Sequence, residues 1–250
     1  MTSELAPKLI VQRRIVAPEA FVQTAADLIR AQLVETLQAR PLAHLCLTGG
    51  STPRPIYQML AARAATGDTS LDWSRVYFYF GDERSVPPDH PDSNYRMAKE
   101  SLLEPLRIPE AHVARLEGEQ PPHTAATRYE ALLHARFPEG RCAFDLLLLG
   151  MGDDGHCASL FPHTSGLSET ERWVIANPVE KLQTTRLSLS FPALNGAREV
   201  LFLVSGVKKA PALTQVLEGA RDVAAWPSQG IVPTQGHVCW LLDEGAAGRP

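Results

Sequence analysis

The sequence contains no long apolar run: within its 250 residues no hydrophobic stretch approaches the roughly 20 residues that span a bilayer. Its first residues lack a basic start followed by an apolar segment, so we expect no secretory signal. Cysteines are few, and they include no Cys-x-x-Cys pair; they are Cys46, Cys142, Cys157 and Cys239. Reduced thiols in a cytoplasmic protein are the simplest interpretation of this pattern.

A basic excess is also absent, since the formal net charge is −4. This slightly acidic net charge argues against a general nucleic-acid binder. If the ligand is an anion, the basic side chains that bind it must therefore be gathered at the binding site. The hydrophobic fraction of 44% and the charged fraction of 21% are typical of a globular chain, and no repeat or long linker interrupts it. We expect one α/β domain over residues 1–250, with no nucleic acid, membrane or obligate protein partner.

Short apolar runs alternate with amphipathic segments along the chain. The predicted strands are Leu9–Val16, Leu42–Leu47, Val76–Phe80, Phe144–Leu149, Leu187–Phe191, Val200–Val204 and Val238–Leu242. The predicted helices follow Pro18 and Pro53 and cover Asn94–Leu103, Thr124–Phe137 and Lys208–Leu217. This alternation predicts an α/β fold with a mostly parallel central sheet and helices on both faces. In such sheets the ligand site lies at the carboxyl ends of the strands, and three polar motifs begin there.

The first motif, Gly49-Gly50-Ser51-Thr52, lies between a predicted strand and a predicted helix. Its glycines let the backbone turn sharply and approach a ligand, its hydroxyls can donate, and the helix start offers free N–H groups to an anion. These properties suit a phosphate. A strand–helix turn capped by Ser or Thr is the alternative, and the motif is not a Walker loop because the Gly-Lys-Ser/Thr ending is missing.

The second motif places Asp82, Glu83 and Arg84 directly behind an apolar strand, in a segment that continues to Asn94. Charges of both signs at a strand end could contact a polar substrate. A solvated loop with a surface ion pair is the alternative interpretation, and spacing alone favours it.

The third motif brackets Asp153, Asp154 and His156 with glycines at the end of the all-apolar Phe144–Leu149 strand. A His flanked by carboxylates suits general-base chemistry near neutral pH. Two alternatives stay open. The His could be satisfied by local backbone bonds, or Asp153, Asp154, His156 and His163 could bind a metal.

Together these motifs resemble those of the 6-phosphogluconolactonases, hydrolases of the oxidative pentose phosphate pathway. The matching stretches follow the family's order and span most of the chain: Leu47–Pro53, Gly81–Met97, Asp145–Pro162, Arg186–Asn195 and Ser205–Ala210. The resemblance implies the α/β fold shared with glucosamine-6-phosphate deaminase, and hydrolysis of 6-phospho-D-glucono-1,5-lactone without metal or cofactor. It also implies that the Gly49–Thr52 loop binds phosphate.

The same resemblance implies roles for single residues. His156 falls on the catalytic His and Arg84 on the active-site Arg, while Arg186 and Lys209 would hold the phosphate. His156 would take a proton from the water that attacks the lactone carbonyl, and Arg84 or loop N–H groups would stabilise the oxyanion. Two carboxylates, Asp82 and Asp154, are candidates for orienting His156 or binding sugar hydroxyls. Asn94 completes the predicted substrate-binding set.

Two departures from the family pattern leave points open. The family commonly has Gly after Leu-Phe-Pro, where this chain has His163, so the local turn is unsettled. The tandem Lys208-Lys209 makes the phosphate lysine ambiguous, and Lys209 is preferred because Ala210 follows it.

Two other functions remain in view. A related deaminase carries a Glu five residues after the His, but this chain has Phe161, which cannot transfer a proton. The substitution disfavours a sugar-phosphate deaminase or isomerase. A non-catalytic sugar-phosphate sensor would place a helix-turn-helix segment before the Gly-Gly loop, whereas the residues there are predicted as strand and helix.

Overall fold

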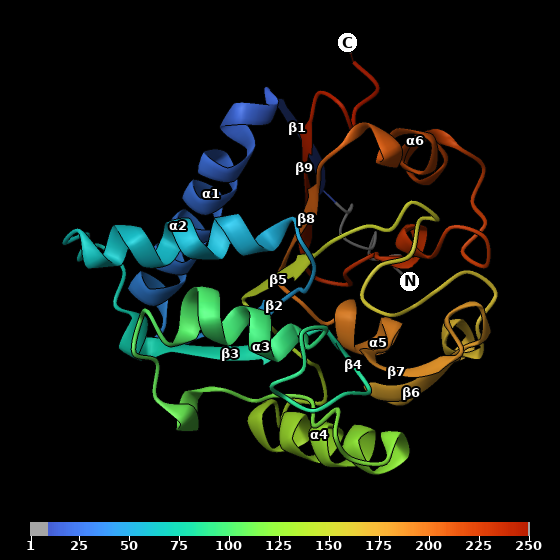
Figure 1. Cartoon of the computed structure of the whole chain (residues 1–250), viewed down its shortest axis with the longest axis horizontal. Helices are drawn as coiled ribbons and strands as arrows, with labels where there is room; N and C mark the ends of the chain where they lie inside the picture. Colours follow the sequence, from blue (N-terminus) through green and yellow to red (C-terminus); the bar gives the residue numbers. More distant parts are fainter. Residues whose placement is uncertain (1–9, 250) are drawn as a thin grey trace, which may run out of the picture.

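The computed structural model describes residues 10–249, which form a central six-stranded sheet beside a smaller three-stranded one (Figure 1). The central strands lie in the order β1-β9-β8-β5-β2-β3, and every pairing is parallel. Their bounds are β1 Ile10–Val16, β2 Ala43–Leu47, β3 Val76–Phe80, β5 Leu146–Leu149, β8 Glu199–Val204 and β9 His237–Asp243. These strands confirm the predicted parallel sheet; Leu9, the first residue of the predicted N-terminal strand, lies outside the described residues.

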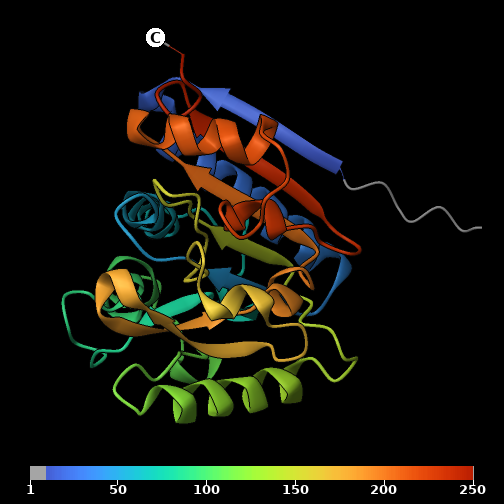
Figure 2. The same cartoon turned by 90° about the vertical axis from the view of Figure 1, so that its right-hand side faces the viewer.

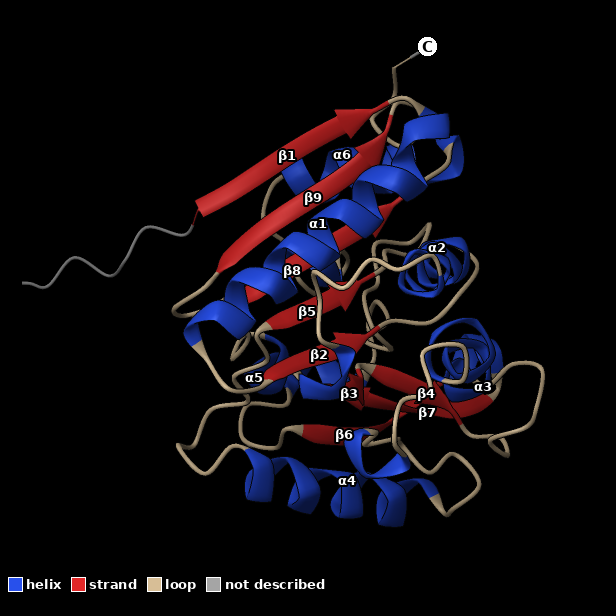
Figure 3. Ribbon diagram, turned by 90° about the vertical axis from the view of Figure 1, so that its left-hand side faces the viewer, coloured by secondary structure: helices blue, strands red, loops and turns tan. Residues whose placement is uncertain are grey.

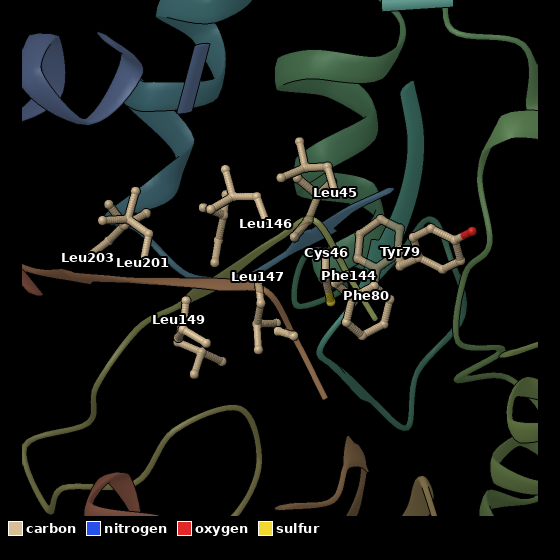
Figure 4. Close-up of a cluster of buried hydrophobic side chains, with 14 of the residues drawn as sticks. Leu45, Cys46, Tyr79, Phe80, Phe144, Leu146, Leu147, Leu149, Leu201 and Leu203 are labelled. Carbon is tan, nitrogen blue, oxygen red and sulfur yellow. The ribbon is translucent and has the colours of Figure 1, made fainter. Parts of the chain in front are cut away.

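The middle of the sheet is apolar on both faces. All four leucines of β5 are buried, as are Leu45, Cys46 and Leu47 of β2. Figure 4 shows Leu146 projecting to one side of the β5 ribbon, and Leu147 and Leu149 to the other. Parallel strands covered on both faces have this continuous apolar sequence, because a solvated face would require alternation with polar residues.

Helices cover both faces of this sheet, as predicted. Figure 3 shows α1 crossing in front of the strands and α6 lying behind them, and Figure 2 shows α6 from its own side. The helices are α1 Pro18–Ala39, α2 Pro53–Ala65, α3 Asn94–Ala98, α4 Pro122–Arg136, α5 Phe191–Leu194 and α6 Ala210–Glu218; a π-helical turn, Lys99–Leu103, extends α3. No helix among residues 10–249 has the length and apolar character required to cross a bilayer.

The small sheet corrects one part of the prediction. Its strands are β4 Asp82–Arg84, β6 Val174–Val179 and β7 Thr184–Leu189, paired antiparallel in the order β4-β7-β6. The run Leu187–Phe191, predicted as a strand of the parallel sheet, instead ends β7, and Phe191 begins α5. The proline after Phe191 suits a first helical turn.

Candidate active site

A cavity of about 640 Å³ opens at the carboxyl ends of β2, β5 and β8, and residues of β4 and β7 complete its wall. All eleven residues that the sequence marked as candidates line it: Gly49, Gly50, Ser51, Thr52, Asp82, Arg84, Asn94, Asp154, His156, Arg186 and Lys209. The three motifs, distant in the sequence, therefore meet around one space.

The Gly-Gly loop is shaped by both of its glycines. Gly50 has φ +101°, a backbone conformation that L side chains rarely adopt. A Cβ on Gly49 would lie 1.8 Å from Oδ1 of Asn94, so only glycine lets the two segments approach. Thr52, the N-cap residue of α2, makes no side-chain capping bond. The capped-turn interpretation therefore does not hold, and the Thr52 hydroxyl is available to a ligand.

Asp82 is held by hydrogen bonds inside the pocket wall. Its Oδ2 accepts from Oγ of Ser159 at 2.6 Å, and its Oδ1 accepts from Nδ2 of Asn94 at 3.0 Å. Asp82 is 9% exposed and Asn94 only 2%. The interpretation of this segment as a solvated loop is therefore wrong, and Asp82 keeps a fixed orientation at the cavity.

Glu83 supports the site from outside the cavity. Its carboxylate accepts from the backbone N–H groups of Arg84, Asn94 and Tyr95 at 2.7–2.9 Å, and from Oγ of Ser93 at 3.0 Å. Burial raises the pKa of Glu83, and these backbone donors only partly oppose that rise. This carboxylate thus binds β4 to the start of α3 and does not face substrate.

Two arginines form a cationic wall. Arg84 on β4 and Arg186 on β7 are directly opposite in the antiparallel register, an arrangement that is unfavourable for like charges. Neither guanidinium forms an ion pair within residues 10–249, and the buried Nε of Arg186 has no hydrogen-bond partner. Burial, followed by the charge of Arg84, lowers the pKa of Arg186. An anion bound at this wall would relieve the repulsion.

The imidazole of His156 lines the same cavity. Its Nδ1 lies 2.5 Å from Oδ1 of Asp154, and Nε2 has no hydrogen-bond partner among the described residues. Burial would raise the pKa of Asp154, but the bonds from His156 and Lys181 outweigh it and hold this pKa below its usual value. An ionised carboxylate at Nδ1 favours the tautomer that carries its proton there, which leaves Nε2 as an acceptor facing the cavity.

The backbone around His156 leaves room for this pair. A Cβ on Gly152 would lie 2.0 Å from Nδ1 of His156 and 2.6 Å from Oδ1 of Asp154. Gly155 has φ +75°, and its carbonyl accepts from the N–H of Ser228 at 2.9 Å. Both glycines are thus required by the conformation that brings the imidazole to the carboxylate.

Of the tandem lysines, Lys209 lines the cavity, while Lys208 is exposed and does not. Nζ of Lys209 lies 2.5 Å from Oδ1 of Asp153. His163 is exposed and outside the cavity wall. Among residues 10–249 no three His, Cys, Asp or Glu side chains converge as metal ligands, so the four residues considered for a metal site do not form one.

The model of a family described as glucosamine-6-phosphate isomerases/6-phosphogluconolactonase matches residues 17–240. The chain belongs to this family. The 6-phosphogluconolactonase of Nostoc sp. is 38% identical over 231 residues, which cover 91% of this chain and 92% of that relative.

Solved structures of the family agree with this fold. The 6-phosphogluconolactonase from Thermotoga maritima gives a TM-score of 0.78 at 28% identity, covering 94% of this chain and all of that one (100%). A monomeric glucosamine-6-phosphate deaminase also gives 0.78, at 22% identity, covering 96% of this chain and 99% of that chain, a likeness that bears on the fold alone. The predicted α/β fold, common to both activities of the family, is confirmed.

Phe161 and His163 lie on either side of Pro162 and have different environments. Phe161 is buried and stacks on His156, with ring centroids 4.1 Å apart and planes inclined by 30°. His163 is exposed and adopts φ +60°, a backbone conformation that glycine adopts more readily than other residues.

Sequence reasoning missed Lys181, which enters the cavity wall from the turn between β6 and β7. No sequence signal identifies Lys181 as a site residue, because Glu180-Lys181-Leu182 is an ordinary polar turn that follows no apolar run of the central sheet. Only the packing of the small sheet against the His156 loop brings it to the site.

Proposed function

We propose that this chain hydrolyses 6-phospho-D-glucono-1,5-lactone to 6-phosphogluconate, by attack of a water that His156 activates. One observation carries the proposal: the free Nε2 of the His156–Asp154 pair shares a single cavity with the unpaired cationic wall of Arg84 and Arg186. A substrate with a phosphate at one end and an activated ester at the other matches this arrangement. Membership of the family and the 6-phosphogluconolactonase relatives support the same substrate.

The reaction begins with water beside Nε2 of His156. As the water oxygen bonds to the lactone carbonyl carbon, its proton passes to Nε2, and the charge of Asp154 stabilises the imidazolium that forms. A general base of this kind is worth about 10²–10⁴ in rate. The negative charge gathers on the carbonyl oxygen, where Arg84 or N–H groups of the glycine-rich loops stabilise it.

The tetrahedral intermediate then collapses with cleavage of the bond between the carbonyl carbon and the ring oxygen. That oxygen takes the proton back from the imidazolium and leaves as the sugar hydroxyl. The new carboxylic acid ionises near neutral pH, so each turnover releases one proton. No redox partner or acyl-enzyme is needed.

Binding of the distant phosphate fixes the carbonyl against the water. We assign this end to Arg186, Lys209 and the Gly49–Thr52 loop, where hydroxyls, cations and the N-terminus of α2 converge on the cavity. Asn94 holds Asp82 in the wall, and the Asp82 carboxylate is placed to accept from sugar hydroxyls. Phe161 stands where a deaminase needs an acid–base group, which disfavours isomerisation.

We further propose a cytoplasmic location. The four cysteines all lie within residues 10–249 and form no disulfide, and the three that are buried suit a reducing compartment.

The test is turnover. Purified protein is given the freshly prepared lactone, and acid release is followed in weak buffer against the spontaneous rate. Release far above background, lost by about 10²–10⁴ in His156→Ala while 6-phosphogluconate still binds, supports the proposal. Ammonia from glucosamine 6-phosphate would instead indicate a deaminase, and tight sugar-phosphate binding without any turnover would indicate a sensor.

A further inference from the structure

Lys181 reaches the cavity from the tip of the β6–β7 hairpin, which belongs to the small sheet. The tip is a single 3-10 turn, Glu180–Leu182, followed by Gln183 at φ +49°. The Lys181 side chain is 51% exposed, and it lines the same cavity as His156.

Two contacts connect Lys181 to the imidazole. Its Nζ donates to Oδ2 of Asp154, the oxygen that His156 leaves unused. The same Nζ lies 4.7 Å from the ring centroid of Phe161, which stacks on His156. Lys181 thus contacts both groups that orient the imidazole, the carboxylate at Nδ1 and the ring against its face.

We propose that Lys181 is a positioning residue of the reaction: from the hairpin it fixes Asp154 on Nδ1 of His156 and so keeps Nε2 aimed into the cavity. This inference rests on the proposed function, because His156 must act as a base for its alignment to matter. A carboxylate on a glycine-bracketed loop can rotate, and an ammonium bound to its second oxygen restricts that rotation.

The energetics favour a role in alignment over a role in stability. The Lys181 and Asp154 side chains are 51% and 32% exposed, and ion pairs this accessible to water typically contribute little to folding stability. Loss of Lys181 should therefore leave the fold intact. Mutation of a residue that orients a functional His through another side chain commonly lowers activity by about 10–100-fold.

The experiment compares Lys181→Met with a matched control, Lys99→Met. Lys99 is 47% exposed and pairs with Glu104 at 3.3 Å, outside the cavity wall. We expect Lys181→Met to lower kcat about tenfold with KM within about twofold. Lys99→Met should match wild type. Lys181→Arg should recover most of the loss, because a guanidinium also donates to carboxylates and stacks on aromatic rings.

The outcomes separate this inference from the proposed function. If wild type and Lys99→Met do not hydrolyse the lactone, the proposed function is wrong. If both are active and Lys181→Met keeps the wild-type kcat, Lys181 does not position the base. A rise in KM with kcat unchanged would make Lys181 a substrate ligand, which also overturns the inference.

Discussion

Gly152→Ala should inactivate the protein without unfolding it. The added methyl group would lie 2.0 Å from Nδ1 and 2.2 Å from Cε1 of His156, and 2.6 Å from Oδ1 of Asp154. Gly152 does not have a positive φ, so the backbone itself accepts Ala. The three atoms nearest to the added methyl group therefore all belong to the catalytic pair.

The size of the loss follows from these distances. Side-chain carbons do not approach other atoms closer than about 3.0 Å, so the imidazole must move by about 1 Å or more. A displacement of 1 Å at a catalytic group can cost about 10²-fold in rate, equivalent to about 2.7 kcal/mol in activation free energy. Replacing Gly by Ala also reduces the entropy of the unfolded chain, which offsets part of any strain by about 0.4–1 kcal/mol.

The assay is initial-rate acid release from the lactone, corrected for spontaneous hydrolysis, with the melting temperature measured alongside. Gly81→Ala is the matched control, since its Cβ would meet only Leu47 O at 3.6 Å and Cys46 Sγ at 3.9 Å. We expect kcat to fall about 10²-fold in Gly152→Ala and to stay near wild type in Gly81→Ala. Wild-type kcat in Gly152→Ala would refute the assignment of the His156–Asp154 pair.

Four further predictions follow from the site and its supports. Lys209→Met should raise KM about tenfold or more with a smaller change in kcat, because a charge-assisted phosphate contact contributes about 1.5–3 kcal/mol; steady-state kinetics tests this, and an unchanged KM contradicts it. Glu83→Gln should lower the free energy of unfolding by about 1–3 kcal/mol, since an amide nitrogen cannot accept from the backbone donors of α3. Urea denaturation measures this change, and an unaltered midpoint would show that the Glu83 hydrogen bonds do not stabilise the fold. His163→Gly should raise stability by up to about 1 kcal/mol and leave kcat unchanged, because the φ of +60° disfavours a side chain; a lower melting temperature would contradict this. The folded-state pKa of Asp154 is depressed, so its ionisation stabilises the protein above the unfolded-state pKa of about 3.9, and this contribution is lost as the pH falls. The difference in stability between wild type and Asp154→Asn should therefore shrink in acid, and a difference that grows there would contradict the depressed pKa.

The sequence predicted the central sheet and the three loops because their signals are local. An all-leucine strand such as β5 must be buried on both faces, and glycine-rich polar segments directly after such strands meet at one edge of a parallel sheet. The residues of those loops accordingly all line one cavity.

The small sheet was not predicted, for reasons that are equally physical. β4 has three residues, all charged, and β6 contains Pro178, so neither resembles a strand in isolation. β4 becomes a strand because backbone N–H groups satisfy the Glu83 carboxylate with hydrogen bonds and because β7 pairs with it. Glu83 and Lys181 could not be assigned from sequence, since their partners are defined only by this packing.

The division of the cavity between two sheets has a consequence for substrate range. The reactive imidazole and the glycine loops follow strands of the central sheet, whereas Arg84 and Arg186 belong to strands of the small antiparallel sheet and Lys181 to its β6–β7 turn. The exposed residues beside Lys181 at the β6–β7 tip, Glu180 and Leu182, can therefore vary while Lys181 and the buried strands that carry the chemistry stay unchanged. Retargeting toward longer or differently charged lactones should begin at these two positions, where substitutions disturb no core residue.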